Sequence, residues 1–361
     1  MKKQRVVVGM SGGVDSSVSA LLLKEQGYDV VGLFMHNWEE EDEKGCCTSA
    51  DDWQDALAVS GKIGIPCYSV NFAKQYMDRV FEYFLREYEL GRTPNPDVLC
   101  NREIKFAPFK QYALELGADF IATGHYCDIG EIDGVPILKT ALDQNKDQTY
   151  FLNQVKTEQL TRVLFPLGKM DKTEVRKIAL ENDLVTAKKK DSTGICFIGE
   201  RKFREFLQEY LPNKRGKIVD TTGKVVGEHY GLMYYTLGQR KGLGIGGVAG
   251  EDQARWYVIE KRLDKNELVV SCGEGEELFS NALDGSGLNI IGPWDKNEFR
   301  CTAKFRYRQS AQPVTVKIDG DKIHIEFDEP QRAVTPGQYA VLYYEDRCLG
   351  GTVIDKTYKY E

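Results

Sequence analysis

The stretch from Val6 to Ser17 constrains the fold of this chain more than any other. Val6-Val7-Val8 is typical of a buried β-strand, and the turn Gly9-Met10-Ser11-Gly12-Gly13 follows it at once. Apolar residues then recur at helical spacing until Gly27. Because the free N–H groups of the first helical turn and the positive end of the helix dipole face the same point, this order predicts an anion site.

The residues of the turn indicate which anion it suits. Gly12-Gly13 lets the backbone approach a phosphate closely, the serines at positions 11, 16 and 17 add hydroxyl donors, and Asp15 either positions a magnesium ion or caps the helix. No lysine lies between Arg5 and Lys24, so the turn lacks the lysine of a Walker loop, and the three-glycine spacing of a dinucleotide site is absent. Transfer of a γ-phosphate and dinucleotide binding are therefore disfavoured.

Length and composition predict a cytoplasmic protein of two or three domains. The chain has 361 residues, of which 42% are hydrophobic and 29% charged. No apolar run reaches the roughly 18 residues that span a bilayer, so we expect no membrane association. The N-terminal residues run directly into the first strand without a secretory signal.

The cysteines and the charge of the chain bear on its disulfide content and on the kind of partner it binds. The nine cysteines are odd in number and form no C-x-x-C motif, so we expect reduced thiols and not a disulfide framework. The net charge of −7 argues against nucleic acid, but residues 188–217 hold 9 Lys/Arg against 4 Asp/Glu. On charge alone, a solvated surface explains this basic tract as well as a polyanion partner does.

The pattern up to about Leu167 alternates between strands and helices, which predicts an α/β fold with a doubly wound parallel sheet. Ligands of such sheets lie beyond the carboxyl ends of the strands, where Met35-His36 and Thr123-Gly124-His125 fall. Strands are predicted at 30–35, 65–70 and 120–123, and helices at 51–63, 72–89 and 106–116; the stretch 157–182 is predicted to be mostly helical, most clearly at 172–180.

The remainder of the chain is predicted to form two smaller domains. A helix over 202–210 precedes short strands separated by glycines, and about six alternating strands after Leu288 indicate a small barrel. We therefore expect a parallel-sheet domain with the predicted anion site over 1–200, a small mixed central domain over 201–280 and a C-terminal β-barrel-like domain over 281–361.

Two loops each contain a cysteine in a polar setting. Two prolines fix the turn that holds Asp97 three residues before Cys100, and the segment 191–199 brings Cys196 close to Lys188-Lys189-Lys190. Neighbouring cations favour the nucleophilic thiolate. On residue type alone, each cysteine is more typical of a small buried apolar residue, so both interpretations stay open here.

Five spaced motifs together resemble a known family. The segment Ser11–Ser16 resembles the PP-loop of the N-type ATP pyrophosphatases, which cleave ATP between the α and β phosphates. The whole chain closely resembles the bacterial tRNA-specific 2-thiouridylases. The stretches that carry the resemblance are Ser11–Ser16, Asn95–Asn101, Ala122–Tyr126, Lys146–Gln148 and Ser192–Phe197, continued by Phe305–Arg308 and Pro336–Gln338.

The resemblance implies a role for each matching residue. ATP, with Mg²⁺, would be held by Gly9, Met10, Ser11, Gly12, Gly13, Val14, Asp15, Ser16, Met35 and Gly124. The target uracil would face Asn95, Pro96 and Asp97, and the catalytic residues would be Cys100, Cys196 and Asp97. Contacts with tRNA would come from His125, Lys146, Asp147, Gln148, Arg306, Tyr307 and Gln338.

The implied reaction makes chemical sense of these parts. Adenylation converts the C2 oxygen of the wobble uridine into a good leaving group and releases pyrophosphate. A persulfide on Cys196 then attacks C2, and Cys100 attacks the Cys196 sulfur to leave a disulfide. Asp97 would act as acid or base, or position the base, and its alternative role is to stabilise the turn. A sulfur-relay protein or a cysteine desulfurase would supply the persulfide, the anticodon loop of tRNA would be the partner, and the enzyme would be a monomer without a tightly bound cofactor.

Other readings of the same residues remain. An adenylating ligase or amidotransferase would use the ATP chemistry without the two cysteines. An iron–sulfur thiolase would bind a cluster through Asp97, Cys100 and Cys196. A non-catalytic, nucleotide-dependent RNA-binding module would bind RNA without releasing pyrophosphate.

Overall fold

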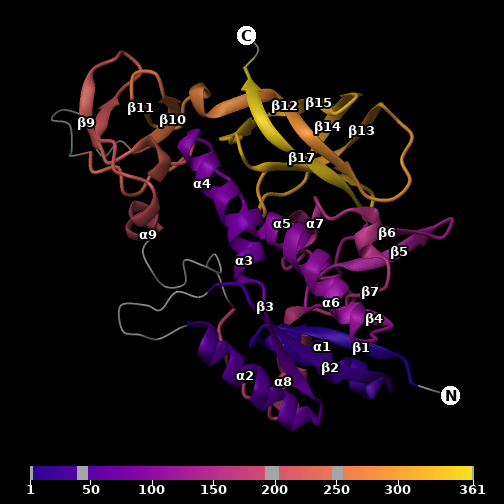
Figure 1. Ribbon diagram of the computed structural model, residues 1–361. Helices are drawn as coiled ribbons and strands as arrows, with labels where there is room; N and C mark the ends of the chain where they lie inside the picture. Colours follow the sequence, from indigo (N-terminus) through magenta and orange to yellow (C-terminus); the bar gives the residue numbers. More distant parts are fainter. Residues whose placement is uncertain (1–2, 39–47, 192–202, 246–254, 360–361) are drawn as a thin grey trace.

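The computed structural model describes residues 3–38, 48–191, 203–245 and 255–359 and places them in a parallel-sheet domain below and two β-rich domains above it (Figure 1). The predicted α/β class, with a parallel sheet, a smaller central domain and a terminal barrel, is confirmed. The acidic stretch 39–43 and the segment that holds Cys196 lie outside the described residues. None of the helices in these ranges combines the length and apolar character that crossing a bilayer requires.

The parallel sheet has the order β3-β2-β1-β4-β7. Its strands are β1 (Arg5–Met10), β2 (Asp29–His36), β3 (Cys67–Asn71), β4 (Phe120–Ala122) and β7 (Val163–Leu164). Val6, Val7 and Val8 of β1 are at most 1% exposed, as expected for a central strand covered on both faces. The strand order reverses between β1 and β4, so their carboxyl ends form the topological switch point where ligands bind.

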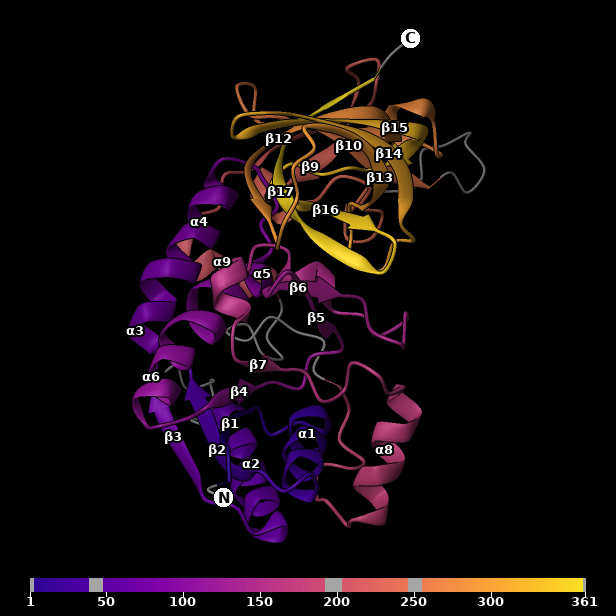
Figure 2. The ribbon, with the colours of Figure 1, turned by 90° about the vertical axis from the view of Figure 1, so that its right-hand side faces the viewer.

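Helices cover both faces of this sheet (Figure 2). One face packs against α1 (Val14–Glu25), α2 (Thr48–Ile63) and α8 (Lys172–Glu181), which share a core with Val6, Val8 and Phe34. The other face packs against two long helical rods and α7. The first rod is α3 (Ala73–Tyr76), η1 (Met77–Phe81) and α4 (Glu82–Glu89); the second is α5 (Pro96–Cys100), η2 (Asn101–Phe109) and α6 (Lys110–Glu115); α7 is Thr149–Leu152.

The central domain is a small sheet of order β10-β11-β8-β9 with its own core, which includes Ile218, Val258 and Leu268. The helix α9 (Phe203–Tyr210) precedes it and packs on the first rod, since the Phe206 and Tyr210 rings lie 6.0 and 4.8 Å from Phe81. The other elements are β8 (Gly216–Val219), β9 (Val225–His229), η4 (Leu232–Tyr234), β10 (Trp256–Arg262) and β11 (Glu267–Cys272).

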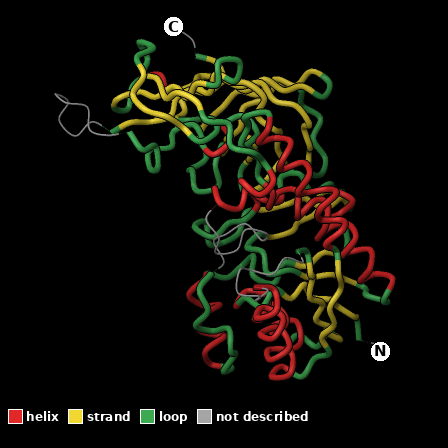
Figure 3. The backbone as a smooth tube through the Cα atoms, turned by 60° about the vertical axis from the view of Figure 1, so that its left-hand side comes forward, coloured by secondary structure: helices red, strands yellow, loops and turns green. Residues whose placement is uncertain are grey.

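The C-terminal domain is a closed barrel of the order β12-β15-β14-β13-β16-β17, closed by the pairing of β12 with β17. In Figure 3 its strands lie at the end of the molecule that carries the C-terminus. Leu283, Phe305 and Ile325 are at most 1% exposed in its interior. The elements are η5 (Glu276–Leu278), β12 (Phe279–Ile290), β13 (Glu298–Lys304), β14 (Gln312–Asp319), β15 (Lys322–Arg332), β16 (Tyr339–Tyr344) and β17 (Arg347–Tyr358).

Three elements differ from the sequence expectation. A hairpin of β5 (Asp128–Ile132) and β6 (Val135–Lys139) leaves the parallel-sheet domain and pairs with β17 of the barrel. The stretch 157–182, expected to be mostly helical, contains only η3 (Thr157–Leu160) and α8 as helices, with β7 between them. The helix expected from Phe106 begins ten residues earlier, because Pro96 is well suited to the first helical turn.

Candidate active site

The PP-loop connects β1 to α1 at the switch point of the parallel sheet. Gly12 has a φ of +68°, and a side chain there would overlap the backbone of Asp52 in α2. Ser16 accepts a hydrogen bond from the Ser11 N–H at 3.1 Å and donates to the Gly13 carbonyl at 3.2 Å, so the hydroxyl holds the turn closed. The turn therefore presents its remaining N–H groups at the start of α1, as a phosphate site requires.

Gly124 closes the other side of this site. It follows β4, and a Cβ atom there would lie 2.8 Å from the Ser16 nitrogen and 2.8 Å from the Asp15 carbonyl carbon. Only glycine lets the two loops approach so closely. Met35 lies at the end of the neighbouring strand β2, so the predicted ATP residues that the structure describes meet at one edge of the sheet.

A cluster of charges continues from the PP-loop. Lys172, at the start of α8, donates to both carboxylate oxygens of Asp15, at 2.7 and 2.8 Å, and contacts Asp191 at 2.9 Å. Asp191 also pairs with Lys146 and Arg176, each at 2.8 Å. Three cations thus surround the residue at which the Cys196 segment begins.

The charges in this cluster shift the acidity of its members. Burial alone would raise the pKa of Asp191, but hydrogen bonds from Lys146 and Lys172 outweigh it and lower the pKa to about 2. The Tyr126 hydroxyl donates to Asp15 at 2.8 Å, and burial together with that carboxylate raises the pKa of Tyr126. At neutral pH Asp191 is ionised and Tyr126 is a neutral donor.

Asp15 is also the acidic side chain of this site that fits the magnesium ion of bound ATP. Magnesium takes most of its ligands from phosphates and water and adds one or two carboxylates. The described part of the chain contains no group of three or more His, Cys, Asp or Glu side chains arranged to hold a metal ion. Asp15 lies in the first turn of α1, beside the phosphate site, so it can supply a carboxylate to an ion that arrives with ATP.

The predicted target-base residues begin the second helical rod. Asn95 precedes α5 with an extended backbone and does not cap it with its side chain, and Pro96 occupies the first turn. Asp97 and Cys100 are three residues apart in α5 and so lie on the same side of the helix. Cys100 is 1% exposed, whereas Asp97 is only partly buried, and burial raises the pKa of the Asp97 carboxyl while Lys105 opposes the rise.

His125 connects the loop after β4 with the second helical rod. It follows Gly124, its Nδ1 lies 2.8 Å from the Thr123 hydroxyl, and its ring lies 6.1 Å from Phe106 of η2. Burial, together with the charge of Lys105, lowers the pKa of His125 well below its usual range. The ring is therefore neutral at neutral pH, so a contact of His125 with tRNA would be stacking or a hydrogen bond and not a cation–phosphate pair.

The three residues of the stretch 146–148 differ in their surroundings: Asp147 is buried, whereas Lys146 and Gln148 are partly exposed. Lys146 reaches Asp191, whereas the buried Asp147 accepts from the Ala141 N–H at 3.0 Å and from the Thr149 hydroxyl at 2.6 Å. The Gln148 side chain accepts from the Tyr126 N–H at 3.0 Å. Asp147 and Gln148 thus support the loop that presents Lys146, and the tRNA contacts expected of all three stay predictions.

The predicted tRNA residues of the barrel contact other parts of the chain. Arg306 donates to the Leu237 and Ala333 carbonyls at 3.0 and 2.8 Å, which joins the central domain to the barrel. The Tyr307 ring lies 4.4 Å from Phe151 of α7. The Gln338 amide donates to the Thr93 carbonyl at 2.8 Å. Their contacts with tRNA likewise stay predictions.

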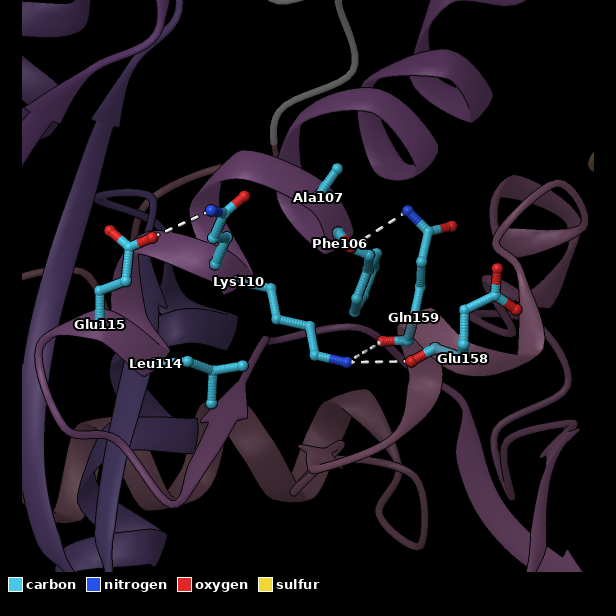
Figure 4. A pocket seen from close by; sticks show the side chains of 8 residues that line it. Phe106, Ala107, Lys110, Leu114, Glu115, Glu158 and Gln159 are labelled. Carbon is cyan, nitrogen blue, oxygen red and sulfur yellow. Dashed lines mark hydrogen bonds between the residues drawn. The ribbon is translucent and has the colours of Figure 1, made fainter.

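A surface cavity of about 430 Å³ lies beside the second rod and is separate from these residues (Figure 4). It is lined by Phe106, Lys110, Leu114 and Glu158, among others, and none of its lining residues was expected in the site. The Lys110 ammonium group donates to the carbonyls of Glu158 and Gln159 at 3.2 and 2.9 Å. The lysine that lines this cavity therefore secures η3.

Sequence reasoning missed Lys172, Arg176 and Tyr126. One signal was available for Lys172, which is the first residue of α8, after the capping residue Asp171. A cation is disfavoured at a helix N-terminus, so a lysine there indicates a partner outside the helix. Tyr126 and Arg176 carry no such local signal, because their partners are distant in sequence.

Family models match the chain in three consecutive parts. They are described as the tRNA methyl transferase HUP domain, over residues 4–200, the tRNA methyl transferase PRC-barrel domain, over 204–272, and the aminomethyltransferase beta-barrel domain, over 281–354. The first match alone covers more than half of the chain.

Individual relatives match along nearly the whole length. The tRNA-specific 2-thiouridylase MnmA of Streptococcus thermophilus (strain ATCC BAA-491 / LMD-9) is 58% identical over 360 residues, which cover 99% of this chain and 96% of that protein. The protein of the same name from Streptococcus mutans is 58% identical, over 99% of this chain and 97% of its own. Among solved structures, the U34-tRNA thiolase NcsA from Methanococcus maripaludis is similar to this chain, with 20% sequence identity and a TM-score of 0.37. The similarity covers 57% of this chain and 63% of the NcsA chain. Because relatives that are more than half identical extend over almost every residue, the chain belongs to the family of the tRNA-specific 2-thiouridylases.

Proposed function

We propose that this protein is an ATP-dependent tRNA sulfurtransferase that converts the wobble uridine of tRNA into 2-thiouridine. It adenylates the C2 oxygen of the uracil, replaces that oxygen by sulfur, and releases AMP and pyrophosphate. The observation that carries the proposal is the 58% identity to a tRNA-specific 2-thiouridylase over 99% of the chain. The glycine-rich turn at the sheet's switch point, which has no Walker lysine, supports cleavage of ATP between its α and β phosphates.

ATP and its magnesium ion enter as substrate at the PP-loop. The phosphates lie against the first N–H groups of α1, between Gly12 and Gly124, and Met35 borders the site from β2. The Lys172 ammonium group pairs with Asp15 in the structure, so it is placed to bind a phosphate when ATP enters the site. We assign the binding of ATP to residues Gly9 to Ser16, Met35 and Gly124.

The target uracil is placed against Asn95, Pro96 and Asp97. A carboxyl group with a raised pKa keeps its proton to a higher pH, so Asp97 can donate a hydrogen bond to the base or exchange a proton with it. Cys196 carries the transferable sulfur as a persulfide, which attacks C2 and displaces AMP. The Cys100 thiolate then attacks the Cys196 sulfur, so that thiouridine leaves and a Cys100–Cys196 disulfide forms. A two-electron reductant restores the two thiols.

The partner of this chemistry is tRNA, bound through its anticodon loop. We infer contacts with it from His125, Lys146, Asp147, Gln148, Arg306, Tyr307 and Gln338. A sulfur-relay protein or a cysteine desulfurase delivers the persulfide, and the enzyme acts in the cytoplasm as a monomer. We assign the three domains to residues 1–200, 201–280 and 281–361.

A thiolation assay tests the proposal directly. The protein is incubated with unmodified tRNA, ATP, magnesium and a persulfide donor, and the nucleosides are analysed by mass spectrometry while pyrophosphate is followed in parallel. We expect 2-thiouridine from the wild type and none from Cys100→Ala or Cys196→Ala. Cys272→Ala is the matched control, since Cys272 is an exposed cysteine of the central domain, and it should retain full activity.

Two outcomes of this assay and of the purification would favour a different function. Release of pyrophosphate without 2-thiouridine, under conditions in which a known thiouridylase works, would favour an adenylating ligase. Visible absorbance after anaerobic purification that is lost in Cys100→Ala would favour an iron–sulfur thiolase.

A further inference from the structure

The link between the two helical rods, Gly91–Pro94, contacts both of the other domains. It follows α4 and leads directly into Asn95, Pro96 and Asp97. We call these four residues the 91–94 link. Its surroundings decide how precisely the proposed target-base residues are held.

The central domain holds the first half of the link. Lys261 of β10 donates to the Gly91 carbonyl at 2.9 Å, and a Cβ atom on Gly91 would lie 2.6 Å from Leu263. The hydroxyl oxygens of Thr93 and Thr236 are 3.4 Å apart. Two separate segments of the central domain therefore contact the link.

The barrel holds the second half. The Thr93 N–H donates to the Pro336 carbonyl at 3.0 Å, and the Gln338 side-chain amide donates to the carbonyls of Thr93 and Pro94 at 2.8 and 3.5 Å. Gly337 has a φ of +91°, and a Cβ atom there would lie 2.9 Å from the Thr93 nitrogen. The turn at 336–338 thus fits closely against the link.

The N–H groups of Gly91 and Arg92 bond to the end of α4, at the Tyr88 and Glu87 carbonyls, but the second half of the link has little such support, because prolines occupy positions 94 and 96 and lack N–H groups. The Thr93 N–H already serves the barrel, so the carbonyls of Thr93 and Pro94 depend on a donor from elsewhere. Gln338 supplies that donor from a residue 245 positions away in sequence. Its amide is the side chain that fixes the backbone just ahead of Asn95.

We propose that Gln338 is a positioning residue that holds the target-base turn 95–97 through the backbone of the 91–94 link, so that the turn is correctly placed only when the barrel is docked. This inference rests on the proposed function for the meaning of residues 95–97. It assigns Gln338 a role in the rate of the reaction in addition to, or in place of, a contact with tRNA. The two roles separate experimentally, because a positioning defect lowers kcat and a lost contact raises the tRNA dissociation constant.

The test compares Gln338→Ala and Gln338→Glu with wild type, and Gln312→Ala is the matched control. Gln312 is a barrel glutamine whose amide donates to Ser310, away from the link. At saturating tRNA we expect both Gln338 variants to lose about tenfold to a hundredfold in kcat, a loss that a weakened tRNA contact alone would not cause. The pH dependence of kcat should also shift, since Asp97 loses its fixed surroundings.

Hydrogen exchange gives a readout that does not need activity. In Gln338→Ala, amides of a peptide spanning 93–101 should exchange faster, whereas those of β1 and α1 should not change. Unchanged exchange in that peptide, or a loss confined to tRNA affinity at constant kcat, would overturn the inference. A wild type that makes no 2-thiouridine would instead refute the proposed function and leave the exchange result to decide the role of Gln338.

Discussion

Asp97 is a carboxyl group whose ionisation the fold opposes, because burial raises its pKa and Lys105 offsets this only in part. The stabilisation that comes from keeping the proton is complete below the pKa of the unfolded chain and is lost as pH rises through the higher pKa of the folded state. Asparagine resembles the protonated acid at every pH. Asp97→Asn should therefore gain stability relative to wild type as pH rises from about 4 towards 8, while thiolation falls by about 10²–10⁴-fold.

Urea unfolding of both proteins across that pH range, with the thiolation assay alongside, checks this expectation. A stability difference that instead grows on acidification would show that the fold favours the carboxylate.

Lys172 has the opposite effect on Asp191, since it stabilises the ionised form of that carboxylate. Its side chain is 11% exposed, and the carboxylates of Asp15 and Asp191 that it contacts are each about a third exposed. Lys172→Met should cost about 1–2 kcal/mol of the free energy of unfolding at neutral pH, because the lost bonds are charge-assisted but partly screened. The lowered pKa of Asp191 stabilises the fold at every pH above the pKa of this group in the unfolded chain. This stabilisation is lost as the pH falls through about 2, so the cost of Lys172→Met should shrink from about pH 4 downwards.

The matched control is Lys177→Met on the same helix, where the lysine is 72% exposed and pairs with Glu181. It should change the free energy of unfolding by less than about 0.5 kcal/mol. Pyrophosphate release should fall in Lys172→Met alone, and equal effects of the two changes would remove the special role of Lys172.

The residues of the site could be predicted where they form local patterns and not where they pair across the chain. The turn at 11–16 and the helix that follows were readable, because strand, glycines and helix are adjacent. The bonds of Gln338 to Thr93 and of Arg306 to Leu237 depend on how the domains pack, which no local pattern encodes.

At the scale of elements, the hairpin β5–β6 stabilises the contact between the parallel-sheet domain and the barrel. Leu138 of β6 is completely buried, in one core with Ile291 and Cys348. Leu138→Ala should lower the free energy of unfolding by about 2–5 kcal/mol. Ile132→Ala, near the turn of the same hairpin and 37% exposed, should change it by less than about 0.5 kcal/mol, as chemical denaturation would show. Similar costs for both would mean that the hairpin is not packed as described.

The elements missed by sequence reasoning have identifiable causes. The β5–β6 turn contains Asp133-Gly134, both with positive φ, which is a hairpin signal that the expected helix–strand alternation obscured. The two twelve-residue strands β12 and β17 contain glycines that interrupt the alternation. Gly285 and Gly351 are needed there, because a Cβ atom would lie 2.6 Å from the Val353 carbonyl oxygen and 2.7 Å from the Ala340 carbonyl oxygen.

At the scale of the whole molecule, the parallel-sheet domain and the barrel share one large buried cluster, in addition to a core of their own in each domain. Val7 and Tyr150 belong to the same buried cluster as Tyr339 and Val341 of β16, and the Tyr150 hydroxyl donates to the Tyr339 carbonyl at 3.2 Å. We expect these two domains, together with helix α9, whose Phe206 and Leu207 lie in the same cluster, to unfold in one cooperative transition and the sheet of the central domain, which has a core of its own, in another.

Calorimetry and hydrogen exchange of two core variants test this. Val341→Ala should cost about 1–3 kcal/mol and accelerate exchange in β1 and β16 together, whereas Val258→Ala should affect the central domain alone. Acceleration confined to the barrel in Val341→Ala would show that the domains unfold independently.

The close fit of the 336–338 turn against the 91–94 link also limits how members of this family can exchange parts. A barrel transplanted from a relative would bring its own turn. A Cβ atom at Gly337 would lie 2.9 Å from the Thr93 nitrogen, so a larger residue at this position of the turn would clash with the link. A functional chimaera therefore needs a turn and a link that fit each other, although the two segments are encoded more than 240 codons apart. Recombination that pairs a turn with a link it does not fit should yield folded proteins in which the donor barrel misplaces residues 95–97.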